Sequence, residues 1–129
     1  MNLKQTRLVT NNVLKLTDFY EELTGATADV ISAGYVEFQR SPCAGLAITS
    51  AATAAIYGED VLASAANRSL VLDFEVSDVD AQYARLKHSI GEWVQPETDL
   101  PWGNRAMLFR DPDGNLVNMF ATKRASVRE

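Results

Sequence analysis

The sequence predicts an α+β protein built from two tandem β-α-β-β-β modules, because the same succession of elements occurs twice along the chain. Each half begins with a short strand, continues with one amphipathic helix and ends with three further strand candidates. Residues that start or end the helices recur 66 residues apart, and residues at the turn before the last strand recur 70 residues apart: Asn12 with Asp78, Gly25 with Gly91, Gly45 with Asn115 and Leu46 with Leu116. The alternative is an ordinary α+β domain with two similarly capped helices, but a repeat of this length favours two copies of one unit.

The first half contains one helix and four strand candidates. Residues 4–10 are rich in β-branched side chains and alternate roughly, which predicts the first strand. Asn12 is a favoured N-cap, because its side chain accepts a hydrogen bond from the first turn, and Gly25 is typical of a helix end. Between them apolar residues recur at helical spacing: Val13, Leu16, Phe19, Tyr20 and Leu23. Short strands are expected at 27–31, 35–40 and 46–49.

The second half repeats this pattern. Residues 69–76 alternate strictly, with Leu72 and Phe74 on one face of the expected strand and Asp73 and Glu75 on the other. A second helix is expected after the N-cap Asp78, ended by Gly91, with an apolar stripe of Val79, Tyr83, Leu86 and Ile90. Three more strands are expected at 93–95, 105–110 and 116–121.

The composition suits one compact domain or two small fused modules, since the chain has 129 residues of which 47% are apolar. We expect a single domain, 1–129, with module one at 1–50, an Ala-rich linker with a helical turn or two at 51–68, module two at 69–122 and a tail at 123–129. The net charge of −5 argues against a nucleic-acid partner. The sequence has neither a signal peptide nor an apolar run that could span a bilayer, so no membrane partner is expected. The single cysteine, Cys43, excludes an internal disulfide and a cysteine-based zinc cage, and a cytoplasmic protein is expected.

The segment between the last two strands is built for a tight reversal. Asp111 can accept a hydrogen bond from the backbone two residues later, Pro112 presets its own φ, and Gly114 accepts a positive φ without steric cost. Apolar-containing strands flank this DPDGN segment, which predicts a hairpin.

The chain resembles the glyoxalase/bleomycin-resistance/dioxygenase superfamily, also called vicinal oxygen chelate proteins. The resemblance covers nearly the whole chain and rests on a small set of motifs: Phe19-Tyr20 with Gly25, residues 76–80 (VSDVD), Pro101-Trp102-Gly103 and residues 111–115 (DPDGN). It implies that the two modules form a cupped mixed β-sheet with the helices outside and the ligand inside the cup. It also implies a homodimer, since members often dimerise and sometimes exchange modules between chains.

The resemblance also allows the metal positions to be tested. In metal-dependent members such as glyoxalase I, four ligands come from the first and last strands of each module, as His or Gln, then Glu, His and Glu. Counting from the shared motifs places these positions at Gln5, Ile48, Val71 and Asn118. Neutral amides are weak ligands for Zn²⁺, Ni²⁺ or Fe²⁺, and aliphatic side chains cannot ligate at all. We therefore expect a metal-free member without a cofactor.

Bleomycin-resistance-type members resemble this chain in size, acidity and lack of a catalytic metal, and they sequester a drug in the cup. Aromatic side chains beside carboxylates suit a flat ligand that can carry a positive charge. The candidate ligand-binding residues combine strand parity with the aromatic and polar positions of the sheet and its loops: Trp102, Asp73, Glu75, Asn118, Phe109, Phe120, Gln5 and Tyr35. Trp102 is the preferred anchor, because a Trp beside Gly in a polar loop is hard to explain as a core residue.

The main hypothesis is therefore a small-molecule binding protein that acts by sequestration, without catalysis. The first alternative is an enzyme whose metal ligands lie elsewhere: a glyoxalase I-like lyase or isomerase, or an extradiol-type dioxygenase. The second is a metal-free enzyme that uses Asp73 or Glu75 as a general base. Metal analysis of the purified protein separates the first alternative from the other two hypotheses.

Overall fold

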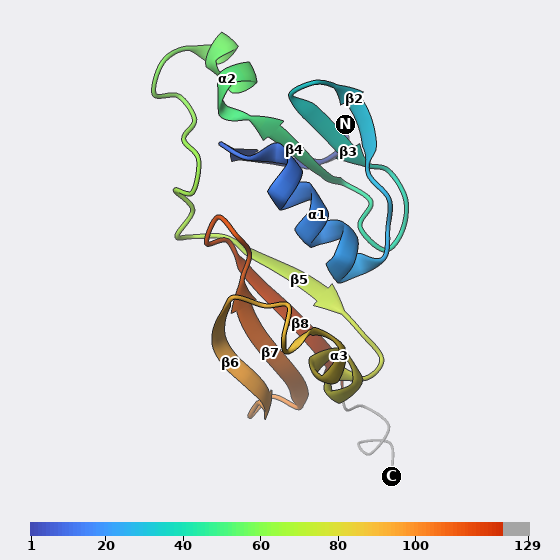
Figure 1. The fold of residues 1–129 in the computed structure, drawn as a ribbon. Helices are drawn as coiled ribbons and strands as arrows, with labels where there is room; N and C mark the ends of the chain where they lie inside the picture. Colours follow the sequence, from blue (N-terminus) through green and yellow to red (C-terminus); the bar gives the residue numbers. More distant parts are fainter. Residues whose placement is uncertain (123–129) are drawn as a thin grey trace. The chain divides into compact units, whose positions relative to one another are not determined.

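The computed structural model describes residues 1–122 and contains both predicted modules. The chain divides into two compact units, Met1–Ala66 and a second unit that begins at Asn67. Each unit holds one four-stranded mixed sheet, and the described residues include three α-helices (Figure 1). The predicted α+β fold with two β-α-β-β-β modules is thus confirmed, whereas the predicted tail at 123–129 lies outside the described residues.

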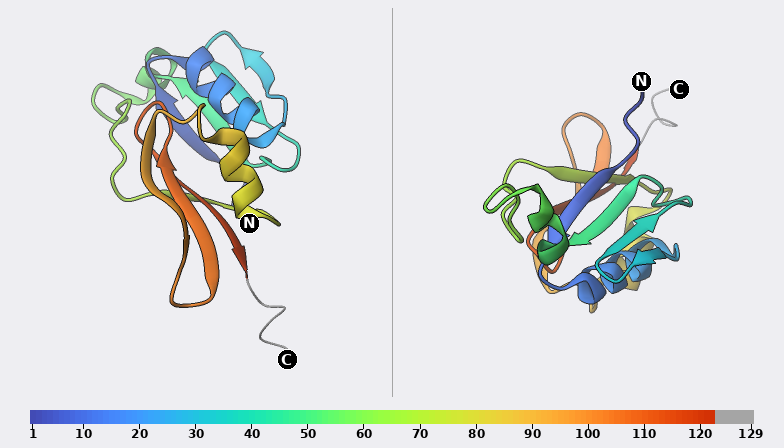
Figure 2. Two further views of the ribbon diagram at one scale, coloured as in Figure 1. Left: turned by 60° about the horizontal axis from the view of Figure 1, so that its bottom comes forward. Right: turned by 90° about the horizontal axis from the view of Figure 1, so that it is seen from above.

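Module one forms its sheet in the strand order β1-β4-β3-β2, with β1 parallel to β4 and the other neighbours antiparallel. Its elements are β1 (Thr6–Thr10), α1 (Val13–Thr24), β2 (Asp29–Ser32), β3 (Tyr35–Phe38) and β4 (Leu46–Ser50). Helix α1 lies along one face of this sheet (Figures 1 and 2). All five elements lie within a few residues of their predicted positions.

Helix α1 begins and ends where its capping residues require. The Asn12 side chain accepts a hydrogen bond from the Lys15 backbone N–H at 3.1 Å, which satisfies one free donor of the first turn. Gly25 adopts a left-handed φ of 77°, and its N–H donates to the Glu21 carbonyl at 2.8 Å. Between these caps the predicted apolar stripe faces the sheet, and Tyr20 is completely buried.

The predicted linker is partly helical. It contains α2 (Ala51–Ala54) and a 3₁₀ turn at Ala55–Tyr57, and it belongs to the first compact unit as far as Ala66. The Ser50 hydroxyl caps α2 by accepting a hydrogen bond from the Thr53 backbone N–H at 2.9 Å.

Module two repeats the topology with the strand order β5-β8-β7-β6, in which β5 is parallel to β8. Its elements are β5 (Val71–Glu75), α3 (Val79–Leu86), β6 (Glu92–Asp99), β7 (Asn104–Arg110) and β8 (Leu116–Thr122). Strands β6 and β7 form a long hairpin (Figure 2). Strand β6 is longer than the three residues predicted, and the loop with Trp102 forms the tip of this hairpin.

The second helix ends earlier than the sequence predicts. Asp78 caps it as expected, with its Oδ1 accepting from the Ala81 N–H at 3.1 Å, but α3 stops at Leu86 instead of running to Gly91. Residues 87–89 are exposed and polar, so another helical turn would bury nothing. Ile90 is still only 8% exposed, but it enters the core from the turn after the helix.

The DPDGN segment forms the predicted reversal between β7 and β8. Asp111, only 4% exposed, accepts hydrogen bonds at Oδ1 from the backbone N–H groups of Asp113 and Asn115, both at 2.9 Å. Its Oδ2 accepts from Asn115 Nδ2 at 2.8 Å, and Gly114 adopts a φ of 85°. The buried carboxylate therefore holds the turn from within.

Within residues 1–122, none of the helices is long and apolar enough to cross a membrane.

Candidate functional site

Each sheet has one face that packs against its helix and one that points away from it. In module two the packed face is joined to α3 through ring contacts, with Tyr83 of α3 5.2 Å from Trp93 and Trp93 5.3 Å from Phe109 between ring centroids. The opposite side, here called the α3-distal face, carries the alternate residues of β5, β8 and β7. Strand register places six of the larger side chains on it: Val71, Asp73, Glu75, Leu108, Asn118 and Phe120.

Two of the predicted ligand-binding residues contact each other on this face. Asn118 Nδ2 donates a hydrogen bond to Asp73 Oδ1 at 2.9 Å, across the parallel pair β5 and β8. The Asn118 Oδ1 atom is buried and has no hydrogen-bond partner among the described residues. Asp73 is exposed, so one of its carboxylate oxygens remains open to solvent or to a ligand donor.

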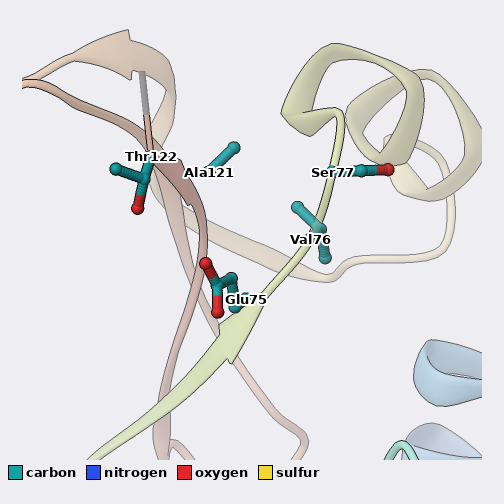
Figure 3. A pocket seen from close by; sticks show the side chains of 5 residues that line it. All are labelled: Glu75, Val76, Ser77, Ala121 and Thr122. Atoms are coloured by element: carbon teal, nitrogen blue, oxygen red, sulfur yellow. The ribbon is translucent and has the colours of Figure 1, made fainter. Parts of the chain in front are cut away.

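Glu75 lies next on the same strand, beside a hollow in the surface. The hollow has a volume of about 470 Å³ and is lined by Glu75, Val76, Ser77, Ala121 and Thr122 (Figure 3). Figure 3 shows Glu75 on β5, Thr122 on β8 and Ser77 on the connection to α3. Among the described residues, no group forms a hydrogen bond or ion pair with the Glu75 side chain. The carboxylate is therefore available at the edge of a space large enough for a small molecule.

Trp102 occupies the tip of the β6–β7 hairpin and is 72% exposed. The tip lies at the same end of the sheet as the hollow, because Asn104 pairs with Thr122 and Ala106 pairs with Phe120, which in turn pairs with Glu75. An indole this exposed contributes little to the core, which agrees with the sequence-based argument for Trp102.

Phe109 does not lie on this face, and its inclusion among the ligand-binding candidates is wrong. It is completely buried on the α3 side, where it packs edge-on against Trp93. Trp93 belongs to β6, and its ring contacts serve the core. The alternation of β7 decides this placement: Leu108 faces away from α3, so its neighbour Phe109 must face toward it.

The face of the module one sheet that points away from α1, here called the α1-distal face, includes Arg7, Ala47 and Glu37. It carries a continuous chain of hydrogen bonds. Gln5 Nε2 donates to the Tyr35 hydroxyl at 2.8 Å, and that hydroxyl donates to Glu37 Oε2 at 2.5 Å. Gln39 Nε2 donates to Glu37 Oε1 at 2.7 Å, so both carboxylate oxygens are occupied. The predicted residues Gln5 and Tyr35 are thus brought together, around a glutamate that the sequence reasoning missed.

The same contacts shift the acid–base properties of this chain. The hydrogen bond from Tyr35, and secondarily the one from Gln39, lowers the pKa of Glu37 because both stabilise the carboxylate. Burial, followed by the hydrogen bond to Glu37, raises the pKa of Tyr35. Tyr35 therefore remains a neutral phenol near neutral pH and acts as a hydrogen-bond donor.

A second polar contact on this face involves Arg7. Its guanidinium donates from Nη2 to the Tyr57 hydroxyl at 2.8 Å, and the guanidinium carbon lies 5.3 Å from the centre of the Tyr57 ring. Arg7 is in register with Ala47 of β4, and Ala47 with Glu37 of β3. Tyr57 comes from the 3₁₀ turn after α2, so the segment predicted as a linker contributes to the site.

The register also corrects the count of equivalent positions. Asp73 pairs with Asn118 in module two, and Arg7 pairs with Ala47 in module one, so the position equivalent to Asn118 is Ala47. Ile48 is completely buried beside Leu8 on the helix-packed side, so the count that placed a ligand position at Ile48 was one residue too far along the chain. Equivalent positions of β4 and β8 are therefore 71 residues apart in sequence instead of 70. The turn residues gave a separation of 70 because turn residues alone do not determine the register.

The corrected set of residues does not fit the family's metal. Gln5 directs its amide N–H toward Tyr35, Ala47 and Val71 have no donor atom, and Asn118 directs its amide N–H toward Asp73. Imidazole and carboxylate ligands, which Zn²⁺, Ni²⁺ and Fe²⁺ select, are missing from these four positions. Across residues 1–122, no group of three or more His, Cys, Asp or Glu side chains could hold a metal ion.

Two other residues with shifted pKa values, Arg105 and Cys43, have structural roles. Arg105 forms ion pairs with Asp80 at 2.8 Å and Asp99 at 3.1 Å, and these hydrogen bonds raise its pKa. Burial raises the pKa of Cys43 to about 11, which leaves a neutral thiol and agrees with the expectation that it is a poor nucleophile.

Sequence reasoning missed Glu37, Tyr57 and the two hydroxyl residues of the hollow, Ser77 and Thr122. Glu37 could have been found from strand parity, because it lies two residues after Tyr35 on one expected strand. Tyr57 carried no comparable signal, since its contact with Arg7 joins residues 50 positions apart.

Comparisons with known proteins identify the family and the fold. A family model described as the Glyoxalase/Bleomycin resistance protein/Dioxygenase superfamily matches residues 2–119. The uncharacterized protein YraH of Bacillus subtilis (strain 168) is 30% identical over 126 residues, which cover 93% of this chain and 98% of YraH.

Solved structures show the same fold at low identity. A glyoxalase/bleomycin resistance protein/dioxygenase from Nocardioides matches with a TM-score of 0.77 and 24% identity, covering 95% of this chain and 83% of that chain. A family enzyme from Burkholderia phytofirmans PsJN matches with a TM-score of 0.81 and 12% identity, covering 95% and 99% of the two chains.

Proposed function

This chain belongs to the glyoxalase/bleomycin resistance protein/dioxygenase superfamily, and we propose that it is a metal-free binding protein that sequesters a small aromatic ligand, above all a cationic one. The observation that carries the proposal is the 470 Å³ hollow beside Glu75, whose carboxylate has no partner among the described residues. Membership of the superfamily is compatible with binding or catalysis, so the choice depends on the chemistry of the site.

The charge of the α3-distal face favours a cationic ligand. Asp73 and Glu75 lie two residues apart on one strand face, which separates them by about 7 Å. Two like charges at this spacing repel each other unless they are solvated or paired. Asn118 donates to Asp73 alone, so a positively charged group near Glu75 would relieve the repulsion.

Apolar surface near these carboxylates favours an aromatic ligand. Phe120 is in register with Glu75, and Leu108 is in register with Asn118. Trp102 exposes its ring at the same end of the sheet. A flat cation could contact these side chains through stacking and cation–π interactions while its charge faces the carboxylates.

Catalysis through a metal is the less favoured function, because the donor atoms at the family's ligand positions do not fit a transition metal. The prediction is checked by elemental analysis of protein that has been purified without metal and then reconstituted. Stoichiometric Ni²⁺, Zn²⁺ or Fe²⁺ would contradict the metal-free proposal and restore the lyase, isomerase or dioxygenase alternative.

The binding proposal is tested by calorimetric titration with proflavine, a planar aromatic cation, and with acridine, which has the same ring system but is mostly neutral near pH 7. Proflavine should bind more tightly than acridine. The double variant Asp73→Asn/Glu75→Gln should weaken proflavine binding about tenfold or more while preserving the fold. Trp102→Ala should weaken it by about 1–3 kcal/mol if the ring is an anchor.

A matched control is available in the linker, within the first compact unit. Glu59 and Asp60 are exposed and have no hydrogen-bond partner among the described residues, so Glu59→Gln/Asp60→Asn makes the same change in net charge elsewhere. The control should leave proflavine binding unchanged. Equal affinity in all variants would show that the α3-distal face is not the binding site.

We further propose that the protein is a cytoplasmic homodimer. In support, the edge strand β2 exposes Val30 and Ile31, at 75% and 53%, and such an edge favours pairing with another chain. Sedimentation velocity over a range of concentrations tests the dimer, and a concentration-independent monomer of 14 kDa would contradict it.

A further inference from the structure

The α1-distal face of module one carries the positive charge of Arg7, which forms no ion pair with an acid of residues 1–122. Arg7 is exposed, and its guanidinium makes one hydrogen bond to the Tyr57 hydroxyl and one approach to the Tyr57 ring, while its charge also acts on the nearby Tyr35. Arg40 and Arg105 do form ion pairs, Arg40 with Asp29 at 3.2 Å and Arg105 with two aspartates, whereas Arg85 and Arg110 donate hydrogen bonds to the Gln82 side chain and the Gly114 carbonyl. Arg7 is distinguished by its partner, because its guanidinium is held by an aromatic hydroxyl and an aromatic ring while its remaining N–H donors meet no acid within residues 1–122.

We propose that Arg7 and Tyr57 form a binding site for the carboxylate of a small aromatic acid. This site lies in the first compact unit, on β1 and the 3₁₀ turn after α2, and does not depend on the cation site proposed for module two. It adds a second class of ligand, because the sign of the required charge is opposite.

The hydrogen-bonding capacity of the pair fits a carboxylate. The Tyr57 oxygen accepts a hydrogen bond from Arg7, which leaves its own O–H free to donate. Arg7 uses one of its five N–H groups in that contact, so the remaining donors can meet a ligand oxygen. A carboxylate has two oxygens, one for the guanidinium and one for the phenol, and such charge-assisted hydrogen bonds are stronger than neutral ones.

The surroundings of the pair favour an aromatic acid over a simple inorganic anion. Tyr57 is 52% exposed and offers part of its ring, and the neighbouring Ile56 is 83% exposed. A ligand ring can therefore cover apolar surface while its carboxylate is held by polar groups. Phosphate would gain nothing from this apolar surface and has more oxygens than the two groups can satisfy.

The nearest acid on the same face does not occupy the site. Glu37 is separated from Arg7 by strand β4, or about 10 Å between backbones at ordinary strand spacing. Both of its oxygens already accept hydrogen bonds, from Tyr35 and Gln39. It therefore neither neutralises Arg7 nor competes for the free donors.

The test is an NMR titration of the full-length protein with benzoate, followed at the Arg7 Nε–H and at the Tyr57 backbone N–H. Benzamide has the same ring and shape without the charge, while acetate and inorganic phosphate remove the ring. Benzoate should saturate these signals and bind at least about tenfold more tightly than benzamide, because it gains a charge-assisted contact. It should also bind more tightly than acetate and phosphate.

Three variants locate the site. Arg7→Gln should weaken benzoate binding about tenfold or more, and Tyr57→Phe, which keeps the ring but removes the O–H, by about threefold. Arg68→Gln is the matched control, because Arg68 is also exposed and has no contact partner among the described residues. It should leave benzoate binding unchanged.

Several results would overturn the proposal. These are the absence of saturable benzoate binding, equal binding of benzamide, tighter binding of phosphate, or equal losses in Arg7→Gln and Arg68→Gln. The last result would show a general effect of net charge. Because proflavine and its variants probe the other module, failure of the cation site leaves this result unaffected, and the reverse is also true.

Discussion

The two modules place opposite charges at the same position of the same fold. Arg7 on β1 and Asp73 on β5 are equivalent by register, because they pair with Ala47 and Asn118 at equivalent positions of the last strand. Arg7 finds its partner outside the sheet, in Tyr57, whereas Asp73 finds it on the neighbouring strand, in Asn118. The helix-distal faces of the modules therefore differ in charge and in the way that charge is held.

The helix-packed faces differ much less. Phe38 and Phe109 occupy equivalent positions, paired with Leu46 and Val117, and all four side chains are at most 7% exposed. Each Phe packs between its sheet and the helix of its own module. Few other side chains would fill the same space, because protein cores are closely packed. The comparison teaches that the helix-packed face of each sheet is required for the core of its module. The helix-distal face is under less packing constraint and can acquire binding residues.

The largest effect should come from the equivalent core phenylalanines. Phe38→Ala and Phe109→Ala should each destabilise their module by about 3–5 kcal/mol, because each removes a buried ring and leaves a cavity. Urea denaturation followed by circular dichroism measures both, and tryptophan fluorescence reports on module two, which contains Trp93 and Trp102.

Phe120→Ala is the control, since Phe120 is only half-buried on the α3-distal face and should cost much less stability. A small loss for one of the two core variants would break the equivalence of the modules. A large loss for Phe120→Ala would show that the α3-distal face also carries a core.

The turns before the last strands differ more, and the next largest effect should be found there. Asp111 accepts two backbone N–H groups and one side-chain amide, whereas the β3–β4 loop of module one is closed by backbone hydrogen bonds such as Gly45 N–H to the Phe38 carbonyl at 3.1 Å. Asp111→Ala should cost about 2–3 kcal/mol, because buried donors lose their acceptor.

Chemical denaturation of Asp111→Ala should be compared with Asp18→Ala, an exposed acid on α1 without a hydrogen-bond partner among the described residues. The control should change stability by no more than about 0.5 kcal/mol. Equal effects of both variants would mean that the carboxylate does not organise the turn.

The N-caps of the helices should contribute equally, at an intermediate level. Asn12→Ala and Asp78→Ala should each cost about 1 kcal/mol, since each removes one side-chain acceptor for a first-turn N–H at 3.1 Å. Thermal unfolding of both variants measures the loss, with Asn11→Ala as the neighbouring control. A difference of more than about 1 kcal/mol between the two caps would sharpen the comparison, by showing that the charge of Asp78 also interacts with the helix dipole.

The smallest effect should be the pH dependence of module one's hydrogen-bond chain. Because the folded pKa of Glu37 is lowered, its hydrogen bonds stabilise the fold above the ordinary carboxyl pKa, and this stabilisation is lost as the pH falls through the folded pKa. Tyr35→Phe should raise the pKa of Glu37 toward its ordinary value, as measured by carbon-13 NMR titration of the carboxyl group.

Gln39→Ala should raise the pKa of Glu37 less, because the hydrogen bond from Tyr35 is the larger cause of the lowering. A Glu37 pKa that does not change in Tyr35→Phe would show that the Tyr35 contact is not maintained in solution.

Much of the fold follows from short-range patterns in the sequence. Asn12 and Asp78 indicate the starts of the helices because capping is local, involving only the next three residues. The strict alternation of residues 69–76 correctly separated Asp73 and Glu75 from Leu72 and Phe74 for the same reason: side chains on a strand alternate whatever lies around it. The repeat of these signals was sufficient to predict two modules.

The site was predicted less completely, because its contacts join distant parts of the chain. Gln5 and Tyr35 were both expected, and strand parity places Glu37 beside Tyr35, but no local pattern shows that these side chains form one hydrogen-bond chain. Arg7 finds Tyr57 across 50 residues, through a segment that reads only as a linker.

The sequence by itself determined the order of elements, the caps, the DPDGN turn and the family resemblance that the comparisons confirm. Only the tertiary structure decided which of two adjacent residues in the later strands of a module faces the helix. It places Phe109 and Ile48 in the core and Ala47 opposite Arg7. The physical reason is that strand side chains alternate, so a count that is wrong by one residue reverses the face. Turn and cap residues do not determine that count, because it is set by the hydrogen-bonded pairing between strands.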